Sequence, residues 1–441
     1  MKLNVNKFFE LAKENKIESC DLSLTRDKET KISVFHNEVD NFSLSDATSL
    51  VARGIINNKM GTVATEKIDK DTPQFLVNSI IENAKNIESD STPIIFKGSE
   101  KYHRKNVFNP NVVLGDAKEK IELLKTIENK LRTYDKRINE VATVSYSESL
   151  TESLLVNSYG LKLKDRIASC TIVAEVTAKE GEEIKTGYKV FASLNPHEFN
   201  IDKFVKETAE NALKKLGSTQ CKSKKYPTVI ESEPFAQLLK AYLSNTDAEE
   251  VQKKSSMFLN KLNMPIANKK LTVIENPLEK NIFFSYHDDE GVATSKRTLV
   301  NKGVLESYIY TLETAKKDGV EPTGNARVGA KAVAALNCLY VKPGKKTLDE
   351  VLSSIKEGVY ITDLEGLHAG MNAKSGNFSL QAQGFMIRDG KLAEPLSLIT
   401  VAGNLGEMFM NIKEVASEQK MVLNGVFTPD VYFKSLAISG K

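Results

Sequence analysis

Histidine is scarce in this sequence: its 441 residues include only five, at positions 36, 103, 197, 287 and 368. No two of them stand three to five residues apart, so no helix here can present two imidazoles to one metal ion as the HExxH and HExxxH motifs do. This absence argues against a zinc site of that kind. The G-K-[ST] phosphate loop, the G-x-S-x-G nucleophile elbow and the G-x-G-x-x-G dinucleotide fingerprint are also missing.

Cysteine is scarce as well. Cys20, Cys170, Cys221 and Cys338 lie far apart and form no CxxC or CxxH pair. We therefore expect free, largely buried thiols rather than disulfides or a structural zinc site. No histidine stands beside any of them in the sequence to activate a nucleophile, although sequence distance does not exclude a neighbour in space.

Long apolar runs are absent too. Residues 1–16 predict a short amphipathic helix, with charges where a signal peptide has its apolar core, and no stretch has the length of a membrane span. We therefore expect a cytoplasmic protein that does not associate with a membrane. The 61 basic and 58 acidic side chains leave a net charge of +3, and the basic stretch 214–225 is best explained as a solvated linker, so we do not expect a nucleic-acid partner.

The length predicts two or three domains. Residues 217–227 begin with Gly217, are rich in Ser and Lys, and end in Pro227, which is typical of a domain boundary. We expect an N-terminal α+β domain over 1–220, with two helix-and-strand units at 1–85 and 113–217, and a strand-rich, partly barrel-like C-terminal domain over 221–441. The polar stretch 86–112 predicts an exposed connection.

Periodicity predicts the individual elements. Helix patterns with an apolar stripe and strand patterns rich in Val, Thr and Tyr occupy both halves, and Asp389-Gly390 predicts a type I′ hairpin turn. Helices and strands do not alternate strictly, so the α+β class is favoured over a doubly wound parallel sheet. The helices are expected at 73–84, 121–134, 201–216 and 234–243, and the strand pieces of the central region at 139–149, 154–158 and 167–177.

The densest polar cluster is His287 followed by Asp288, Asp289 and Glu290. Three carboxylates beside an imidazole have the chemistry to bind a hard cation or to act as general acid and base. Adjacent side chains point in different directions on a strand or a helix, so these four cannot simply converge on one ion. A charged loop that enters a strand, with Gly291 setting the turn, is the interpretation we favour.

Three further loops have the character of a binding site. Gly324 permits a close backbone approach, Asn325 can hold a turn, and Arg327 can grip a carboxylate. Small polar turns occur in every protein, so each loop alone is a weak indication. The other two loops contain Ser375 with Gly376, and Asn404.

These segments resemble, in order, the sequence signatures of the TldD/PmbA protease family. Residues 288–292 (DDEGV) and 299–308 (LVNKGVLESY) are similar to its DDEG and LI-x-x-G-x-L-x-x-Y motifs, and residues 322–327 (PTGNAR) resemble PTGN-x-R. Further matches follow in the same order at 355–360, 375–379, 384–387 and 402–405, and looser ones precede them at 52–54 and 157–161.

The resemblance implies a distinction between two kinds of member. TldD-like members carry HExxxH on a helix near the start of the C-terminal domain and a later cysteine as a further zinc ligand, whereas PmbA-like (TldE-like) members lack these ligands and pair with TldD in a two-fold dimer. The corresponding helix here, at 234–243, reads PFAQLLKAYL, and no cysteine follows Cys338. The chain is thus identified as a PmbA-like member, with no catalytic or metal-binding residue and no cofactor of its own, and zinc is expected only in a TldD-like partner.

The resemblance further implies a non-catalytic subunit, a pseudoenzyme, that completes a chamber for unfolded peptides in proteolysis or peptide maturation. Two alternatives stay open: an autonomous peptidase with a site around 287–290, and a homodimeric peptide-binding or scaffold protein without a protease partner. Nothing in the sequence suggests contact with DNA gyrase, after which the family is also named. The candidate channel residues are Asp288, Asp289, Glu290, Gly324, Asn325, Arg327, Ser375, Gly376 and Asn404.

Overall fold

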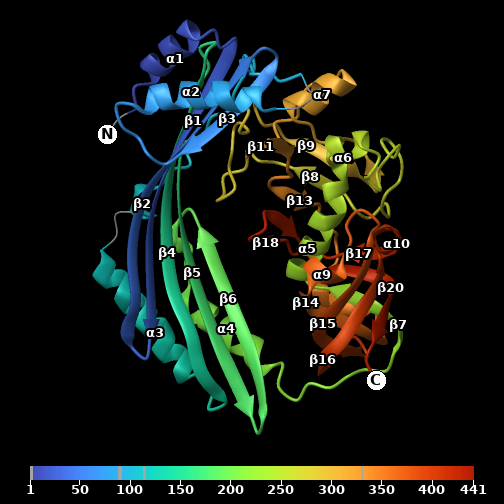
Figure 1. Ribbon diagram of the computed structural model, residues 1–441. Coiled ribbons are helices and arrows are strands. Elements are labelled where there is room, and N and C mark those ends of the chain that lie inside the picture. Colours follow the sequence, from blue (N-terminus) through green and yellow to red (C-terminus); the bar gives the residue numbers. More distant parts are fainter. Residues whose placement is uncertain (1–2, 88–91, 113–115, 330) are drawn as a thin grey trace.

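The computed structural model describes residues 3–87, 92–112, 116–329 and 331–441. Figure 1 shows a long sheet with helices, built from the first half of the chain, beside a strand-rich body built from the second half. None of the helices in these described ranges is long and apolar enough to cross a membrane.

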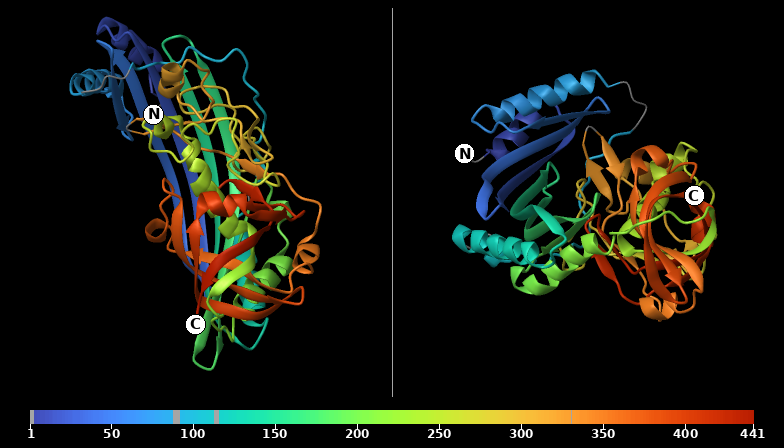
Figure 2. Two further views of the ribbon diagram at one scale, coloured as in Figure 1. Left: turned by 90° about the vertical axis from the view of Figure 1, so that its right-hand side faces the viewer. Right: turned by 90° about the horizontal axis from the view of Figure 1, so that it is seen from below.

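The first half is organised around one antiparallel sheet, which over the described residues has the order β3-β2-β1-β4-β5-β6. Its longest strands have 17 to 20 residues, well beyond the usual length of about 3–10, and Figure 2 (left) shows them running side by side along the molecule. The strands are β1 (Ser19–Phe35), β2 (Glu38–Ile56), β3 (Lys59–Thr65), β4 (Ile138–Asn157), β5 (Lys162–Glu180) and β6 (Glu183–Ser193).

Four helices cover one face of this sheet, in two groups. Leu22 and Ile32 are both even-numbered residues of β1 and therefore lie on the same face. Leu22 packs in the core under the first two helices, and Ile32 packs in the core under the next two. The helices are α1 (Val5–Glu14), α2 (Thr72–Lys85), α3 (Ala117–Arg132) and α4 (Ile201–Leu213).

Two sequence expectations are wrong in this half. The pieces predicted at 139–149 and 154–158 are one continuous strand, β4, because residues 150–153 pair with both β1 and β5 without interruption. The stretch 86–112 is not an exposed connection where it is described: Ile95 and Val107 are buried. Their apolar side chains are too widely spaced to produce a periodic signal. Residues 88–91 of that stretch lie outside the described residues.

The second half contains a closed barrel. In the described part of the chain, five strands follow the order β16-β15-β14-β7-β20, and pairing between β16 and β20 closes the ring. This confirms the expected strand-rich, partly barrel-like body and the α+β class. The barrel strands are β7 (Lys224–Ile230), β14 (Glu357–Glu365), β15 (Asn377–Arg388), β16 (Lys391–Asn404) and β20 (Val431–Ser439), with β17 (Ile412–Val415) added to β20.

A smaller sheet with short strands lies next to the barrel. Its order is β10-β9-β8-β13-β19-β18 over the described residues, and a separate hairpin joins β11 to β12. These strands are β8 (Val273–Glu275), β9 (Arg297–Asn301), β10 (Val304–Leu305), β11 (Ala326–Val328), β12 (Ala332–Ala334), β13 (Leu339–Val341), β18 (Lys420–Val422) and β19 (Val426–Thr428).

Helix α5 joins the barrel to this smaller sheet. Its Phe235 and Tyr242 are buried in the largest core, where the Tyr242 ring stacks on Phe409 with 4.3 Å between centroids. All four cysteines of the chain are free and buried, as expected. The helices of this half are α5 (Ser232–Leu243), α6 (Ala248–Gln252), α7 (Leu312–Asp318), α8 (Leu348–Leu352), α9 (Leu367–Gly370) and α10 (Leu405–Met410).

Candidate functional site

The three adjacent carboxylates of the acidic loop point to three different places. Asp288 is buried and accepts hydrogen bonds from the backbone N–H groups of Glu290 (3.0 Å), Val292 (2.9 Å) and Ala326 (2.9 Å). Glu290 is also buried and accepts from the Leu312 N–H (2.9 Å) in the first turn of α7. The loop therefore uses two of its carboxylates to hold backbone together.

The electrostatics of the loop follow from this burial. Burial raises the pKa of Asp288 to about 7, against the opposing effect of its three N–H donors, and burial likewise raises the pKa of Glu290. Burial lowers the pKa of His287, whose Nδ1 donates to the Asp288 carbonyl oxygen (2.8 Å) rather than to a carboxylate. Across the described ranges, no three His, Cys, Asp or Glu side chains are grouped to hold a metal ion.

Asp289 differs from its two neighbours because it stays half-exposed. It accepts hydrogen bonds from the Arg327 guanidinium (3.1 Å) and from the Val328 N–H (3.0 Å). Asn325 is buried: its Nδ2 donates to Glu275 Oε1 (2.7 Å). The structure thus brings the acidic loop and the 324–327 loop together, and among these residues Asp289 and Arg327 present polar atoms to the solvent.

Gly324 lies at the closest approach between the two loops. Its φ is +71°, and an added Cβ would stand 2.7 Å from the Ala293 carbonyl oxygen. A side chain does not fit there without backbone movement, so glycine serves the packing of the two loops.

This arrangement predicts the effect of removing the exposed pair. Arg327→Ala or Asp289→Ala is expected to change the free energy of unfolding by less than about 1 kcal/mol, because solvent screens an exposed ion pair. Asn325→Ala in the same loop is the matched buried control and is expected to cost about 2 kcal/mol, since it removes the buried amide that donates to Glu275 and leaves that carboxylate with the Asn337 N–H donor. Urea titration followed by far-UV circular dichroism measures both. A loss from Arg327→Ala as large as that from Asn325→Ala would contradict the assignment of Arg327 to the surface.

The loops at 375–376 and 404 form a second group, at the end of the barrel where β15 begins and β16 ends. Asn404 Nδ2 donates to the Ser375 carbonyl oxygen (2.9 Å), and its Oδ1 accepts from the Gly406 N–H (2.9 Å) at the start of α10. The Gly376 carbonyl oxygen accepts from the Leu405 N–H (2.7 Å). No hydrogen bond of the described residues joins this group to the acidic loop, so the candidates do not form one site.

An ion cluster that the sequence did not single out connects the two halves of the molecule. Arg53 of β2 and Asp21 of β1 are cross-strand partners, and Arg53 Nε donates to Asp21 Oδ1 (3.1 Å). Arg53 Nη1 lies 3.7 Å from Glu290 Oε1. All three side chains are buried. An arginine within the apolar run LVARGII was the available signal for a buried, paired charge.

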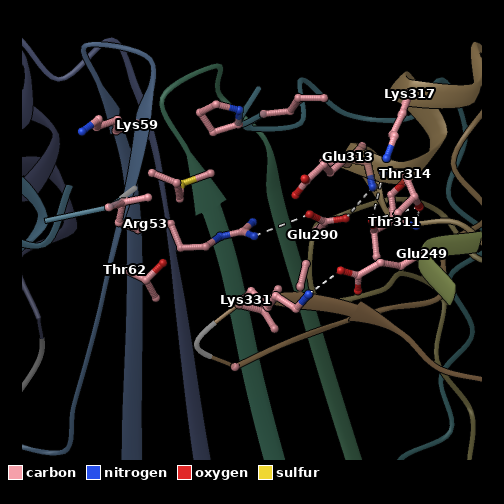
Figure 3. A pocket seen from close by; sticks show the side chains of 18 of the residues that line it. Arg53, Lys59, Thr62, Glu249, Glu290, Thr311, Glu313, Thr314, Lys317 and Lys331 are labelled. Atoms are coloured by element: carbon pink, nitrogen blue, oxygen red, sulfur yellow. Dashed lines mark hydrogen bonds and ion pairs between the residues drawn. The ribbon is translucent and has the colours of Figure 1, made fainter. Parts of the chain in front are cut away.

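A cavity of about 440 Å³ opens beside this cluster, between β2–β3 of the sheet and α6, α7 and the β11–β12 hairpin (Figure 3). Arg53 and Glu290 point toward one another from its opposite walls. Lys59 and Lys317 line it as cations, and Glu249, which is paired with Lys331 at 2.5 Å, lines it as an anion. The charges of this cavity are mixed rather than of one sign.

A wider groove of about 550 Å³ lies at the start of α5, between β6 and α4 on one side and β14 and β18 on the other. Lys420 of β18 stands 3.3 Å from Asp430 Oδ1 and 3.5 Å from Glu231 Oε1. Burial raises the pKa of Glu231. The half-exposed side chains of Met421 and Leu423 add apolar surface. The sequence did not predict this groove because its residues come from segments more than 200 positions apart.

Models of two protein domains match most of this chain. The model of the PmbA/TldA metallopeptidase C-terminal domain matches residues 223–440, and the model of the central domain of the same proteins matches residues 116–216. This chain belongs to the TldD/PmbA family. The resemblance inferred from the ordered motifs is thereby confirmed.

Relatives in this family carry both of its names. A metalloprotease of Methanothermobacter thermautotrophicus is 28% identical over 63% of this chain and 63% of its own length. Metalloprotease PmbA of Escherichia coli is 23% identical over 94% of this chain and 90% of its own length. A TldD homologue of Buchnera aphidicola is 27% identical over 69% of this chain and 66% of its own length. Names alone therefore do not place the chain on one side of the TldD/PmbA family.

Solved structures of the TldD/PmbA family share the whole fold. A protein from Thermotoga maritima described as a modulator of a DNA gyrase is 26% identical and superposes with a TM-score of 0.90 over 98% of this chain and 99% of its own. TldE from Thermococcus kodakarensis is 21% identical, with a TM-score of 0.90 over 98% of this chain and 100% of its own. At that identity the second likeness shows the fold alone.

Proposed function

We propose that this chain is the PmbA-like (TldE-like) subunit of a metalloprotease whose zinc centre belongs to a TldD-like partner. One observation carries the proposal: α5, the helix that corresponds to the HExxxH helix, is complete and borders the wide groove, but it presents Glu233 and Gln237 to that groove and has no imidazole. The HExxxH motif holds zinc through two imidazoles, and one carboxylate and an amide do not replace that pair.

The acidic loop supports this proposal over an autonomous peptidase. Asp288 is enclosed and binds three backbone N–H groups, and Glu290, which lines the 440 Å³ cavity, already binds the Leu312 N–H and lies 3.7 Å from Arg53. A general base must lie within hydrogen-bond reach of the proton it takes. The partner role therefore fits these residues better than catalysis does.

The groove has the features of a peptide channel. Strand β18 is the outermost strand of its sheet over the described residues, and an extended peptide can add to such an edge through main-chain hydrogen bonds. The facing strand β6 is less suited to pairing with a peptide, because two of its carbonyl oxygens already accept hydrogen bonds from side chains. Asn211, in α4, donates to the Tyr188 carbonyl (3.1 Å), and Lys215, just after α4, donates to the Thr186 carbonyl (3.4 Å). Peptide would thus lie along β18, beside Met421.

The experiment is a cleavage and metal assay on the purified chain, alone and mixed with the HExxxH-bearing relative from the same genome, with an unfolded polypeptide as substrate. We expect no bound zinc and no cleavage by the chain alone, and cleavage on mixing that a chelator abolishes. The relative with its HExxxH glutamate changed to glutamine is the matched control and should be inactive in the mixture.

Two results would overturn the proposal. Metal-dependent cleavage by this chain alone would place a catalytic site on it, and residues 287–290 would be the first to test by Glu290→Gln. A genome that encodes no HExxxH-bearing relative would leave the proposed partner without a candidate and would favour the homodimeric peptide-binding alternative.

A further inference from the structure

The cavity between the two halves of the molecule has an unused donor on one wall and an unused acceptor on the other. Asp21 binds Nε and Nη2 of Arg53, which leaves Nη1 without a hydrogen-bond acceptor among the described residues. The Leu312 N–H binds Oε2 of Glu290, which leaves Oε1 without a donor over the same ranges. Nη1 and Oε1 stand 3.7 Å apart, beyond hydrogen-bond distance, and Figure 3 shows the two side chains pointing toward one another.

Burial makes these two unused atoms a site rather than a feature of the surface. Arg53 and Glu290 are only 5% and 6% exposed. A buried polar group without a partner is unfavourable, and a buried charge more so. The space beside them, about 440 Å³, lies within the range of about 300–1,000 Å³ that is usual for small-molecule sites. A ligand that binds both atoms would therefore complete the cavity.

The charges of the cavity restrict what this ligand can be. Glu290 repels a simple anion, and Arg53 repels a simple cation. Two further lining residues repeat this mixture, since Lys317 and Glu313 both line the cavity and neither forms an ion pair within the described part of the chain. A zwitterion, with one acceptor group of negative charge beside one donor group of positive charge, satisfies both walls at once.

We propose that this cavity binds a free α-amino acid with an apolar side chain. The carboxylate of the ligand accepts from Nη1 of Arg53, and its ammonium group donates to Oε1 of Glu290. Standard bond lengths and angles place these two groups of one amino acid about 3 Å apart, which suits a donor and an acceptor separated by 3.7 Å. A dipeptide holds its charged ends farther apart, across a planar trans peptide bond, and does not fit both.

The rest of the lining selects the side chain of the ligand. Met60 of β3 and Ile94 are half-buried, Leu312 of α7 is buried, and all three line the cavity. An aliphatic side chain gains by leaving water for such a surface. Because Arg53 belongs to the sheet and Glu290 to the second half of the chain, the bound amino acid joins the two halves.

Ligand analogues test this site on the unchanged full chain. Isothermal titration calorimetry with L-leucine is expected to show one site. Isocaproate lacks the ammonium group and leucinamide lacks the carboxylate, so each is expected to bind at least about 30-fold more weakly, as the loss of one partner of a buried charge pair implies. L-Serine keeps both charges but has no apolar side chain, and should bind about tenfold more weakly.

Two variants test the residues. Glu290→Gln is expected to weaken leucine binding at least about 30-fold, while its amide oxygen still accepts from the Leu312 N–H. Glu249→Gln is the matched control: Glu249 lines the same cavity, but Lys331 already binds its carboxylate at 2.5 Å. This control should leave the affinity for leucine within about twofold.

These measurements use the chain alone, so their outcome does not depend on the proposed protease partner. Absence of binding heat with L-leucine at millimolar concentration overturns the proposal. Isocaproate, leucinamide or leucyl-leucine binding as tightly as leucine also overturns it, because the site then takes a carboxylic acid, an amine or a peptide end instead. A Glu290→Gln variant that binds leucine as tightly as the unchanged chain excludes the assigned contact.

Discussion

Arg53→Met is expected to lower the free energy of unfolding by about 3–5 kcal/mol, the largest effect that we predict for a single substitution. The arginine is the cation of a buried cluster in which Asp21 and Glu290 are its anions. Methionine fills a similar volume but leaves both carboxylates buried without a counter-charge. Because Glu290 also caps the first turn of α7, the substitution should destabilise the second half of the chain as well as the sheet.

The matched control lies on the same two strands. Arg26 and Asp46 form a two-pronged ion pair between β1 and β2, like Arg53 and Asp21, but in solvent. Arg26→Met should therefore change stability little, since solvent screens the pair and the side chains stay hydrated. Far-UV circular dichroism in a urea titration suits both variants, because the chain has no tryptophan. Equal losses in the two variants would contradict the role assigned to burial.

The pH dependence gives a second readout for Arg53→Met. Burial raises the pKa of Glu290, so its folded state binds a proton more tightly than its unfolded state does. The stability linked to such a group is present below the unfolded pKa and is lost as pH rises through the folded pKa. Removing Arg53 raises the folded pKa further. The variant should therefore lose more stability relative to the wild type at about pH 8 than at about pH 5.

Local patterns predicted most of the fold. The apolar stripe of α4 and the Asp389-Gly390 turn lie where the sequence places them. Such features depend on neighbouring residues and so leave a signal in the sequence. The continuity of β4 does not, because it depends on pairing with β1, more than 100 positions away. The domain boundary at about residue 220 stays a prediction.

The site was predicted less completely than the fold. The sequence indicated the loops that contain Asp288 and Arg327, but not that Asp289 is the partner of Arg327. These two residues are 38 positions apart, so their pairing depends on how the two loops cross. The periodicity of neighbouring residues carries no information on it. The groove at α5 was missed for the same reason: Glu231 and Asp430 come together only when β20 pairs with β7. Ion clusters of this kind become visible only in three dimensions.

The residues of the family motifs therefore have two different roles, one structural and one at the surface. Asp288, Gly324 and Asn325 are buried or tightly packed and hold loops together, which explains why these residue types are needed there. Asp289 and Arg327 remain accessible. If a motif residue touches peptide in this chain, these two are the ones whose replacement would change cleavage in the mixed assay while leaving stability nearly unchanged.

Asp430→Ala is expected to cost about 3 kcal/mol of stability and to disturb the groove. The Asp430 carboxylate accepts from the Ser232 N–H (2.9 Å) at the start of α5 and from the Tyr360 hydroxyl (3.0 Å), and both donors are buried. Alanine leaves both without an acceptor, and each unsatisfied buried donor costs about 1–3 kcal/mol. Since Ser232 begins the helix that borders the groove, cleavage in the mixed assay should fall as well.

Lys420→Ala separates the ion pair from these hydrogen bonds. Lys420 is half-exposed, so its loss should cost less than about 1 kcal/mol while Asp430 keeps its two buried donors. The same urea titration compares the two variants. If Lys420→Ala were as destabilising as Asp430→Ala, the ion pair, rather than the hydrogen bond at the start of α5, would hold the residues of the groove in place. A stable Asp430→Ala variant with reduced cleavage would instead show that this carboxylate contacts the peptide directly.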